Sequence, residues 1–342
     1  MRVSVIIPSK PMQIVSILER VLKDSELNYD VLTIKELNVN RLSDRDAVIV
    51  VGRDRDLLLV HQVLKENDIP ILGVSIGGET SFLMDTHIEN FRRAVEYLAH
   101  GNIIVEEITR IQVESDEMDA FAINEVAIFP RRSASLLEYA LFINDEFVWR
   151  DHCDGVIIAT PMGSTAYALS AGGAIIAPKA RVLEIVSVNS IDPSRRPFVV
   201  PDESEISIRE INSKYTIEII VDGIVREPLK SDYLTIRVAK KPMKLLRLPR
   251  KERIYDERIL KKMRLGEEIL SLPPSAKLVL KVLEYEGPMT QKDLVEKTML
   301  PHRTVRYALS ILISRGLVRE DLLNRDARVK IYRLSQSLRR EK

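Results

Sequence analysis

The chain has 342 residues, of which 45% are hydrophobic and 30% charged, and its formal net charge is +1. This composition excludes an intrinsically disordered chain and predicts a soluble globular protein of two or three domains. No apolar run approaches the ~20 residues of a membrane helix, and the start of the chain predicts a strand rather than a signal peptide. The single cysteine, Cys153, excludes an internal disulfide and favours the reducing cytoplasm.

The charge is distributed unevenly. From Ser275 to the end, 15 basic and 8 acidic residues give +7, whereas the remaining 36 basic and 42 acidic residues give −6. A basic tail on an acidic body indicates contact with nucleic acid. Small domains also scatter in charge, so the asymmetry alone leaves DNA binding and an uninvolved basic surface equally open.

Residues 1–100 alternate between apolar runs and helical spacing. The runs RVSVII, YDVLTI, DAVIVVG and IPILGVSI predict strands, and residues 11–23, 55–66 and 88–98 predict helices. This alternation predicts an α/β domain, in which helices cover both faces of a parallel sheet. Ligands of such sheets bind beyond the carboxyl ends of the strands, which is where the loop after DAVIVVG lies.

The pattern changes after residue 100. Short apolar runs separated by turn residues predict a β-rich, β-sandwich-like domain at 101–244, with a helical insert near 164–172. A highly charged segment at 245–266 follows, and the proline pair at 273–274 marks a boundary. We therefore divide the chain into residues 1–100, 101–244, a linking segment at 245–274, and 275–342.

The most specific motif is DGVIIATPMGSTAYALSAGGAIIAP, residues 154–178. A strand ends at Thr160, and Gly163-Ser164-Thr165 opens a helix whose free N–H groups and hydroxyls suit phosphates or ribose hydroxyls. These three residues alone would more often be an ordinary helix start. The whole motif, however, closely resembles the signature of the NAD kinase family. Members of that family transfer a phosphoryl group from ATP or polyphosphate to the adenosine ribose of NAD.

Other segments follow in the order of the same family. AINEVAI (122–128), PSRRPFVVP (193–201) and IIVDG (219–223) each resemble one of its segments, and residues 245–266 resemble the strand and helix that return to its first domain. The resemblance covers roughly residues 1–266. It implies NAD or NADP as the ligand and a homodimer or homotetramer. It also implies dinucleotide contacts from Asn124, Glu125, Asp154, Thr165, Ala166, Tyr167 and Ser170. We predict no metal ligands within the chain.

The family's phosphate loop reads Gly-Gly-Asp-Gly-Thr, and in that register this chain reads Gly52-Arg53-Asp54-Arg55-Asp56. The aspartate that accepts the ribose hydroxyl proton in the family corresponds to Asp54. Glycine permits positive φ and lets N–H groups approach phosphates, so arginine there should be strained and should fill the donor's space. Asp56 adds a repelling charge. Alternatively, both guanidinium groups bind phosphates directly, or the loop is a solvated turn.

Residues 275–342 predict three helices and then a hairpin, the order of an α+β winged helix-turn-helix domain. The third helix, in LPHRTVRYALSILISRG, resembles the recognition helix of winged-helix regulators, which meets base edges in the major groove. Double-stranded DNA is therefore an expected partner, and protein contact or dimerisation is the alternative. The expected DNA contacts are His302, Arg303, Thr304, Arg306 and Tyr307 on the helix, and Arg325, Arg328 and Lys330 on the wing.

Three functions remain open. The segments that resemble the family's dinucleotide contacts match the family more fully than the donor phosphate loop does. Our main hypothesis is therefore a transcription regulator that couples NAD(P) binding to DNA binding. The alternative is an active NAD kinase with an appended regulatory domain, which would use ATP or polyphosphate with Mg²⁺. The third is a nucleotide-binding protein whose C-terminal domain only mediates assembly.

Overall fold

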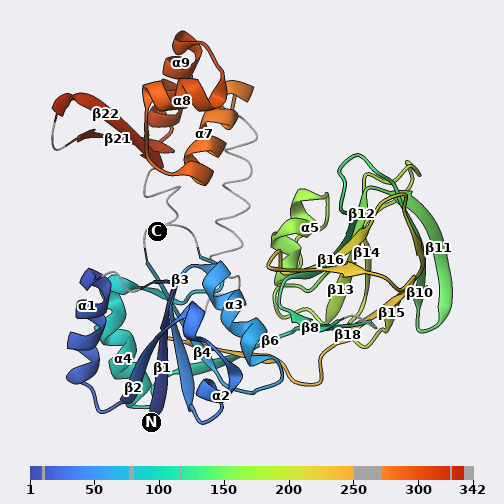
Figure 1. Cartoon of the computed structure of the whole chain (residues 1–342), viewed down its shortest axis with the longest axis horizontal. Coiled ribbons are helices and arrows are strands. Elements are labelled where there is room, and N and C mark those ends of the chain that lie inside the picture. The colour runs from blue at the N-terminus through green and yellow to red at the C-terminus, as the bar shows by residue number, and fades with distance from the viewer. Residues whose placement is uncertain (10–11, 77–80, 116–117, 250–271, 324–325, 335–342) are drawn as a thin grey trace. The chain divides into compact units, whose positions relative to one another are not determined.

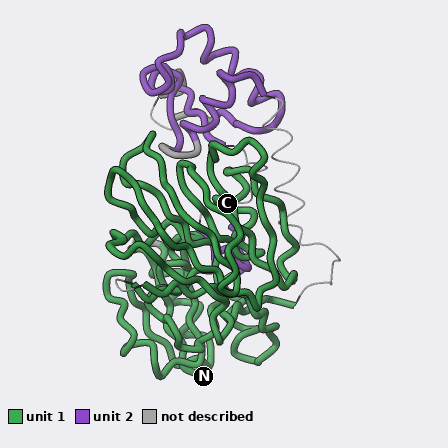
Figure 2. Tube along the Cα trace, turned by 90° about the vertical axis from the view of Figure 1, so that its right-hand side faces the viewer, with its two compact units in different colours: residues 1–73, 91–249 green, residues 74–90, 250–342 purple. Residues whose placement is uncertain are grey.

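The computed structural model describes residues 1–9, 12–76, 81–115, 118–249, 272–323 and 326–334. Contacts divide the chain into two compact units, residues 1–73 with 91–249 and residues 74–90 with 250–342 (Figure 2). Within the described ranges, no helix combines the length and the apolar character needed to span a bilayer.

The first domain is an α/β structure built on one sheet. Its strands are, in order, β2 (Asn28–Thr33), β1 (Arg2–Ile7), β3 (Ala47–Gly52), β4 (Ile71–Ser75), β19 (Met243–Arg247) and β6 (Ile104–Ile108), and β5 (Thr86–His87) pairs with β4. All neighbours with a determined register are parallel except β19 and β6, which are antiparallel. The helices are α1 (Met12–Lys23), α2 (Val39–Leu42), α3 (Asp54–Leu64) and α4 (Phe91–Ala99), with short 3-10 turns at Ile34–Glu36 and Ile88–Asn90.

Helices cover both faces of this sheet. Figure 1 shows α1 and α4 on one face and α3 on the other. Every residue of β3 and β4 is buried, as expected for parallel strands enclosed on both sides. α4 buries Phe91, Ala94, Val95 and Leu98, the spacing of one helical stripe. The predicted α/β domain is therefore confirmed.

Strand β6 corrects one predicted boundary. We assigned residues 104–108 to the β-rich domain, but β6 pairs with β19 at the edge of the first sheet. The chain passes from β6 to the second domain through Thr109 and Arg110, with neither glycine nor proline between. The run IIVEEITRIQVES therefore carries no turn signal at the place where the chain changes domains.

The second domain is a β sandwich. One sheet has the order β11 (Glu146–Cys153), β10 (Leu137–Ile143), β15 (Ile206–Asn212), β18 (Leu234–Val238), β7 (Ile111–Glu114) and β8 (Asp119–Ala122). The other has the order β14 (Phe198–Pro201), β13 (Val182–Val188), β12 (Gly155–Ala159), β9 (Glu125–Pro130), β16 (Ile217–Val221) and β17 (Val225–Leu229). Inward side chains of both sheets, such as Val113, Tyr139 and Ile158, form one buried core. The predicted β-rich domain is confirmed.

A short helix covers part of the outer face of the second sheet. α5 (Tyr167–Ser170) packs Ala168 against Ala127, Ile157, Ala159 and Val186. Because these residues lie on the side of β9, β12 and β13 that faces away from the sandwich core, α5 is held directly on the strands that precede and follow its own segment.

The second unit contains helices and a small antiparallel sheet. From residue 274 onward, its elements are α7 (Pro274–Glu286), β20 (Met289–Thr290), α8 (Gln291–Thr298), α9 (His302–Ser314), β21 (Val318–Leu323) and β22 (Asp326–Leu334), and the strand order is β20, β22, β21. Thr290 caps α8 by accepting a hydrogen bond from the Asp293 N–H group. The three helices share a core that includes Val279, Leu294 and Leu309.

One buried histidine gives the fold a dependence on pH. His61 in α3 is 1% exposed and lies beside Arg110; burial, with a smaller effect of the Arg110 charge, lowers the pKa of its imidazole from 6.5 to about 3. Between pH 6.5 and about 3, His61 is therefore protonated in the unfolded chain and neutral in the folded chain. The contribution of His61 to stability is complete above pH 6.5 and decreases as the pH falls toward 3.

We predict that His61→Asn removes this dependence. The free energy of unfolding of the unsubstituted protein should lose about 1.4 kcal/mol more per pH unit than that of the variant between pH 6 and 4. Urea denaturation at pH 7.5, 6.0, 5.0 and 4.0 measures both slopes. The exposed His100, substituted in the same way, is the control. Parallel slopes for the unsubstituted protein and His61→Asn would contradict the prediction.

Candidate functional site

The candidate site is organised around a buried carboxylate, Asp222. Its Oδ1 accepts hydrogen bonds from the N–H groups of Asn124 (2.7 Å) and Glu125 (3.2 Å), and its Oδ2 accepts one from Ile123 (3.0 Å). Burial raises the pKa of Asp222 to about 6, and the three hydrogen bonds partly oppose this rise. One side chain thus fixes the backbone turn that presents Asn124 and Glu125 at the start of β9.

The segment after β12 is joined to the same turn. The Thr160 N–H group donates to the Asn124 carbonyl (2.9 Å), and the Thr160 hydroxyl donates to the Ile123 carbonyl. Gly163 approaches Asn124 so closely that a Cβ at this position would overlap the Asn124 carbonyl group. Only glycine fits there. Two motifs that are separated in the sequence therefore form one continuous surface.

The predicted helix near 164–172 is shorter than expected. Residues Gly163–Thr165 form a 3-10 turn, and α5 begins only at Tyr167, because Ala166 has non-helical dihedrals (φ −96°, ψ −121°). The buried Ser164 hydroxyl donates to Pro161 (2.7 Å) and accepts from Ile176 (3.0 Å). The Ser164 hydroxyl is therefore used inside the loop, as in the ordinary helix start that these three residues alone favoured.

Tyr167 is the single aromatic residue of the 154–178 motif. It is 43% exposed and stacks on Phe129, with ring centroids 5.7 Å apart and an interplanar angle of 24°. Partial burial raises the pKa of Tyr167, and the charges of Glu125 and Asp154 raise it further. Two other predicted dinucleotide residues, Glu125 and Asp154, are thus within electrostatic range of Tyr167. Of the other predicted contacts, Ser170 is exposed, Ala166 is half-buried and Thr165 is buried.

Asp154 lies at the opposite end of β12 from Thr160. Its Oδ2 accepts a hydrogen bond from the Asn189 side chain (2.8 Å). The neighbouring Asp151 is buried and accepts a hydrogen bond from Arg195 Nε (3.1 Å), and the Arg195 guanidinium lies 4.4 Å from the Trp149 ring centroid. The segment 189–195 is therefore fixed against β11 beside Asp154.

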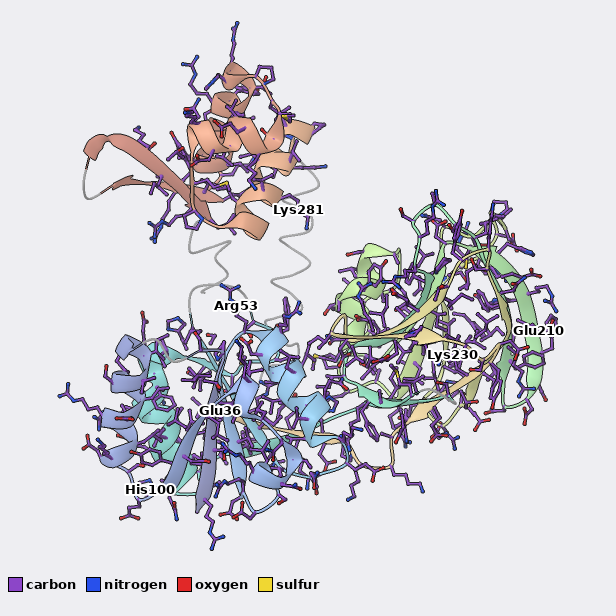
Figure 3. The ribbon with its side chains drawn as sticks, viewed as in Figure 1. Glu36, Arg53, His100, Glu210, Lys230 and Lys281 are labelled. Atoms are coloured by element: carbon purple, nitrogen blue, oxygen red, sulfur yellow. The ribbon has the colours of Figure 1, made fainter. Side chains whose placement is uncertain are left out.

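The loop after β3 differs from our expectation. Arg53 has φ −118° and ψ 170°, and none of residues 52–56 has a positive φ. The predicted strain is absent because α3 begins at Asp54 and Arg53 serves as its N-cap residue, a position with extended backbone that any residue can adopt. Figure 3 labels Arg53 at this end of the first domain.

Asp56 closes the first turn of α3. Its Oδ2 accepts a hydrogen bond from the Arg53 N–H group (2.7 Å), and a Cβ on Gly52 would lie 2.5 Å from the same oxygen. Gly52 therefore makes room for the Asp56 carboxylate, whose pKa is raised by burial. The Arg53 N–H group, which a glycine loop would offer to a phosphate, is already used. The side chains of Arg53 and Arg55 are exposed, and Asp54 is half-buried.

Sequence reasoning missed two residues that hold the site together, Asp222 and Thr160. IIVDG (219–223) was recognised as a segment, yet nothing in it indicates that its carboxylate binds a turn about one hundred residues earlier. In the parts of the chain that the structure describes, no group of three or more His, Cys, Asp or Glu side chains is arranged to hold a metal ion.

The residues predicted to contact DNA lie in the second unit. On α9, Thr304 is half-buried and the others are exposed, including Tyr307 at 61%. Lys330 pairs with Glu320 at 3.0 Å. Arg325 lies outside the described residues, and only the backbone of Arg328 is described. Among the residues predicted to contact DNA, the exposed ones on α9 are His302, Arg303, Arg306 and Tyr307.

An α/β domain joined to a β sandwich, with the 154–178 motif beside Asn124, defines the class of two-domain fold to which the chain belongs. Family models described as the ATP-NAD kinase N-terminal domain and the ATP-NAD kinase C-terminal domain match residues 7–103 and 123–248. The chain belongs to the NAD kinase family.

Individual relatives agree with this assignment. The chain is 30% identical over 241 residues to an NAD kinase of Methanosarcina acetivorans, covering 70% of this chain and 86% of the relative. It resembles the crystal structure of an NAD kinase from Archaeoglobus fulgidus in complex with ATP (TM-score 0.66, 26% identity, 77% of this chain and 99% of that one). Yeast NADH kinase complexed with NADH shares the fold (TM-score 0.66, 20% identity, 78% and 87%).

These relatives overturn our main hypothesis. The proteins similar to this chain are NAD kinases, so the prediction of a transcription regulator is wrong. The expected roles in DNA binding are likewise unsupported, since neither matched range extends beyond residue 248. The error came from treating Arg53 and Arg55 as glycine replacements in a strained loop, whereas the loop is a regular helix start.

We predict that Asp222→Asn weakens dinucleotide binding and lowers stability. An asparagine amide cannot accept all three hydrogen bonds, so the free energy of unfolding should fall by about 2 kcal/mol or more at pH 8. NAD affinity should fall together with it, because the Asn124 turn loses its support. Calorimetric titration with NAD and urea denaturation measure both. Asp119→Asn, a change at an exposed position of the same domain, is the control. Unchanged NAD affinity in Asp222→Asn would refute this role.

Proposed function

We propose that the chain is an active NAD kinase, which transfers a phosphoryl group from ATP or polyphosphate to the adenosine ribose of NAD and yields NADP. Family membership carries this proposal. The position of Asp54 supports it further, because Asp54 is the first residue of α3, at the carboxyl end of β3, where ligands of α/β sheets bind.

Each segment that resembles the family has a role in this proposal. Asn124, Glu125 and Tyr167 hold the dinucleotide together with Thr165, Ala166 and Ser170, and Asp154 lies near the nicotinamide. The ribose hydroxyl oxygen attacks the terminal phosphorus while Asp54 accepts its proton, and the bond between that phosphorus and the bridging oxygen breaks, which releases ADP or a shortened polyphosphate. Mg²⁺ would arrive on the donor phosphates and neutralise their charge, with Asp54 as the nearby carboxylate.

The predicted result for Asp54→Asn is a loss of catalysis with binding retained. Because the amide cannot accept the ribose proton, kcat should fall by roughly 10²–10⁴, while the dissociation constant for NAD stays within a few-fold. NADP formation from NAD with ATP, and separately with polyphosphate, is followed by chromatography. Asp119→Asn again serves as the control. Full activity in Asp54→Asn would remove this aspartate from the mechanism.

We further propose that guanidinium groups replace the backbone cradle for the donor. Asp56 already uses the Arg53 N–H group, so the donor phosphates contact the exposed side chains of Arg53 and Arg55. This arrangement is a side-chain phosphate site at the start of a helix, where the dipole also favours anions.

Replacing both arginines by alanine should therefore raise the KM for the donor and leave the KM for NAD within about threefold. Each lost charge-assisted hydrogen bond is worth about 1.5–3 kcal/mol, so the increase should be at least roughly tenfold. Steady-state kinetics with each substrate varied in turn measures both constants. Arg92→Ala, at an exposed helix position that pairs with Asp24, is the control. An unchanged donor KM argues against the side-chain site.

For the second unit we propose a winged helix fold appended to the kinase, supported by the order of α7, α8 and α9 followed by the β21–β22 hairpin. We also propose an oligomeric enzyme of the cytoplasm, in keeping with the family and with the single, buried Cys153.

A further inference from the structure

The chain crosses between the two domains of the first unit twice, and Arg110 contacts both crossings. It separates β6 from β7, and its carbonyl accepts a hydrogen bond from the Ala239 N–H group (2.9 Å) just after β18. Its Nε donates to the Lys241 carbonyl (2.6 Å), in the segment that leads into β19. Arg110 is only 3% exposed, so a single buried side chain joins the outgoing and the returning segments.

The same guanidinium reaches the carboxyl-terminal end of α3. Its Nη1 donates to the Lys65 carbonyl and lies 3.4 Å from His61 Nε2. The ring of His61 is neutral at physiological pH, so it can accept a hydrogen bond from the cation rather than repel it. Burial lowers the pKa of Arg110, and the negative charges of Glu66 and Asp68 oppose this effect.

The other neighbour of Arg110 is a strand of the β-rich domain. The guanidinium carbon lies 4.7 Å from the centroid of the Phe121 ring in β8. In addition, Gln62 Nε2 of α3 donates to the Phe121 carbonyl (2.6 Å). Phe121 precedes Asn124 by only three residues. The end of α3 is thus attached to the strand that leads directly into the turn carrying Asn124 and Glu125.

α3 transmits this attachment to the proposed catalytic residue. A helix of its length is a rod of about 16 Å, with Asp54 at one end and His61 and Gln62 near the other. A small rotation at the attached end moves Asp54 relative to the Asn124 turn. In phosphoryl transfer, where catalysis depends on positioning, such a displacement is costly.

We propose that Arg110 is a positioning residue. With His61, Gln62, Lys65 and Phe121 it forms an interdomain clasp that sets the distance between Asp54 and the turn carrying Asn124 and Glu125. The catalytic consequence rests on the proposed kinase function, whereas the mechanical coupling of α3 to β8 does not.

The test compares Arg110→Met and Arg110→Lys with Arg247→Met in the full chain. Arg247 is a suitable control because it is also buried (8% exposed) but pairs with Glu106 inside the first sheet. Arg110→Met should lower kcat by roughly 100-fold, the effect of a misplacement of about 1 Å, with the KM for NAD within about threefold. Arg110→Lys should recover part of kcat. Arg247→Met should leave kcat within about threefold.

Hydrogen exchange followed by mass spectrometry provides a second readout. In Arg110→Met, the amides of residues 54–64 and 119–125 should exchange faster together, whereas Arg247→Met should affect only residues 104–108 and 243–247. The proposal is overturned if Arg110→Met lowers kcat no more than Arg247→Met does, or if residues 119–125 keep their protection. If the unsubstituted protein forms no NADP, the proposed function fails, and exchange at residues 119–125 alone decides the coupling.

Discussion

The site depends on the contact between three chain segments at Asn124. The Asp222 carboxylate draws together three consecutive N–H groups, and Gly163 rests on the Asn124 carbonyl with no space for a side chain. Neither contact involves a ligand, yet together they place the Asn124-Glu125 pair beside the loop that leads to Tyr167. Burying an ionised aspartate is unfavourable unless donors surround it, and here the backbone supplies all three. The shape of the proposed dinucleotide site is thus built into the fold.

The loop after β3 leads directly into a helix instead of forming a glycine-rich phosphate loop. Starting α3 at Asp54 places the helix terminus, two arginine side chains and the candidate proton acceptor within three consecutive residues. The Asp56 carboxylate is directed toward the backbone and not toward the proposed ligand. It accepts a hydrogen bond from the Arg53 N–H group and occupies the space that a side chain on Gly52 would need. The loop contains two Arg-Asp pairs and is nevertheless compatible with an anionic donor. Asp54 and Asp56 occupy different positions, and the Asp56 carboxylate accepts a hydrogen bond from the Arg53 N–H group.

Arg110 connects these two regions through neutral partners. Carbonyl oxygens, an aromatic face and an uncharged imidazole surround the guanidinium, so the buried cation is satisfied without a direct carboxylate contact in the described residues. The Nε and Nη1 groups of Arg110 each donate in a specific direction, which restricts the movement of the side chain. The same burial that keeps His61 neutral makes the clasp sensitive to acid, which links the stability of the fold to the geometry between its domains.

The sequence by itself determined the architecture and the family. Continuous apolar runs such as AVIVVG require burial on both faces, alternating runs such as IEIIV require burial on one, and the 154–178 motif is long enough to be specific. The tertiary structure alone decided that β6 joins the first sheet, that Ser164 is used internally, that Arg53 is unstrained, and that Asp222 and Arg110 join distant segments. The contacts of β6, Asp222 and Arg110 join residues tens to more than one hundred positions apart, whereas those of Ser164 and Arg53 are local and depend on where the backbone starts a turn or a helix. Periodicity reports only which face of an element is buried, and it carries no information about the partner that buries it.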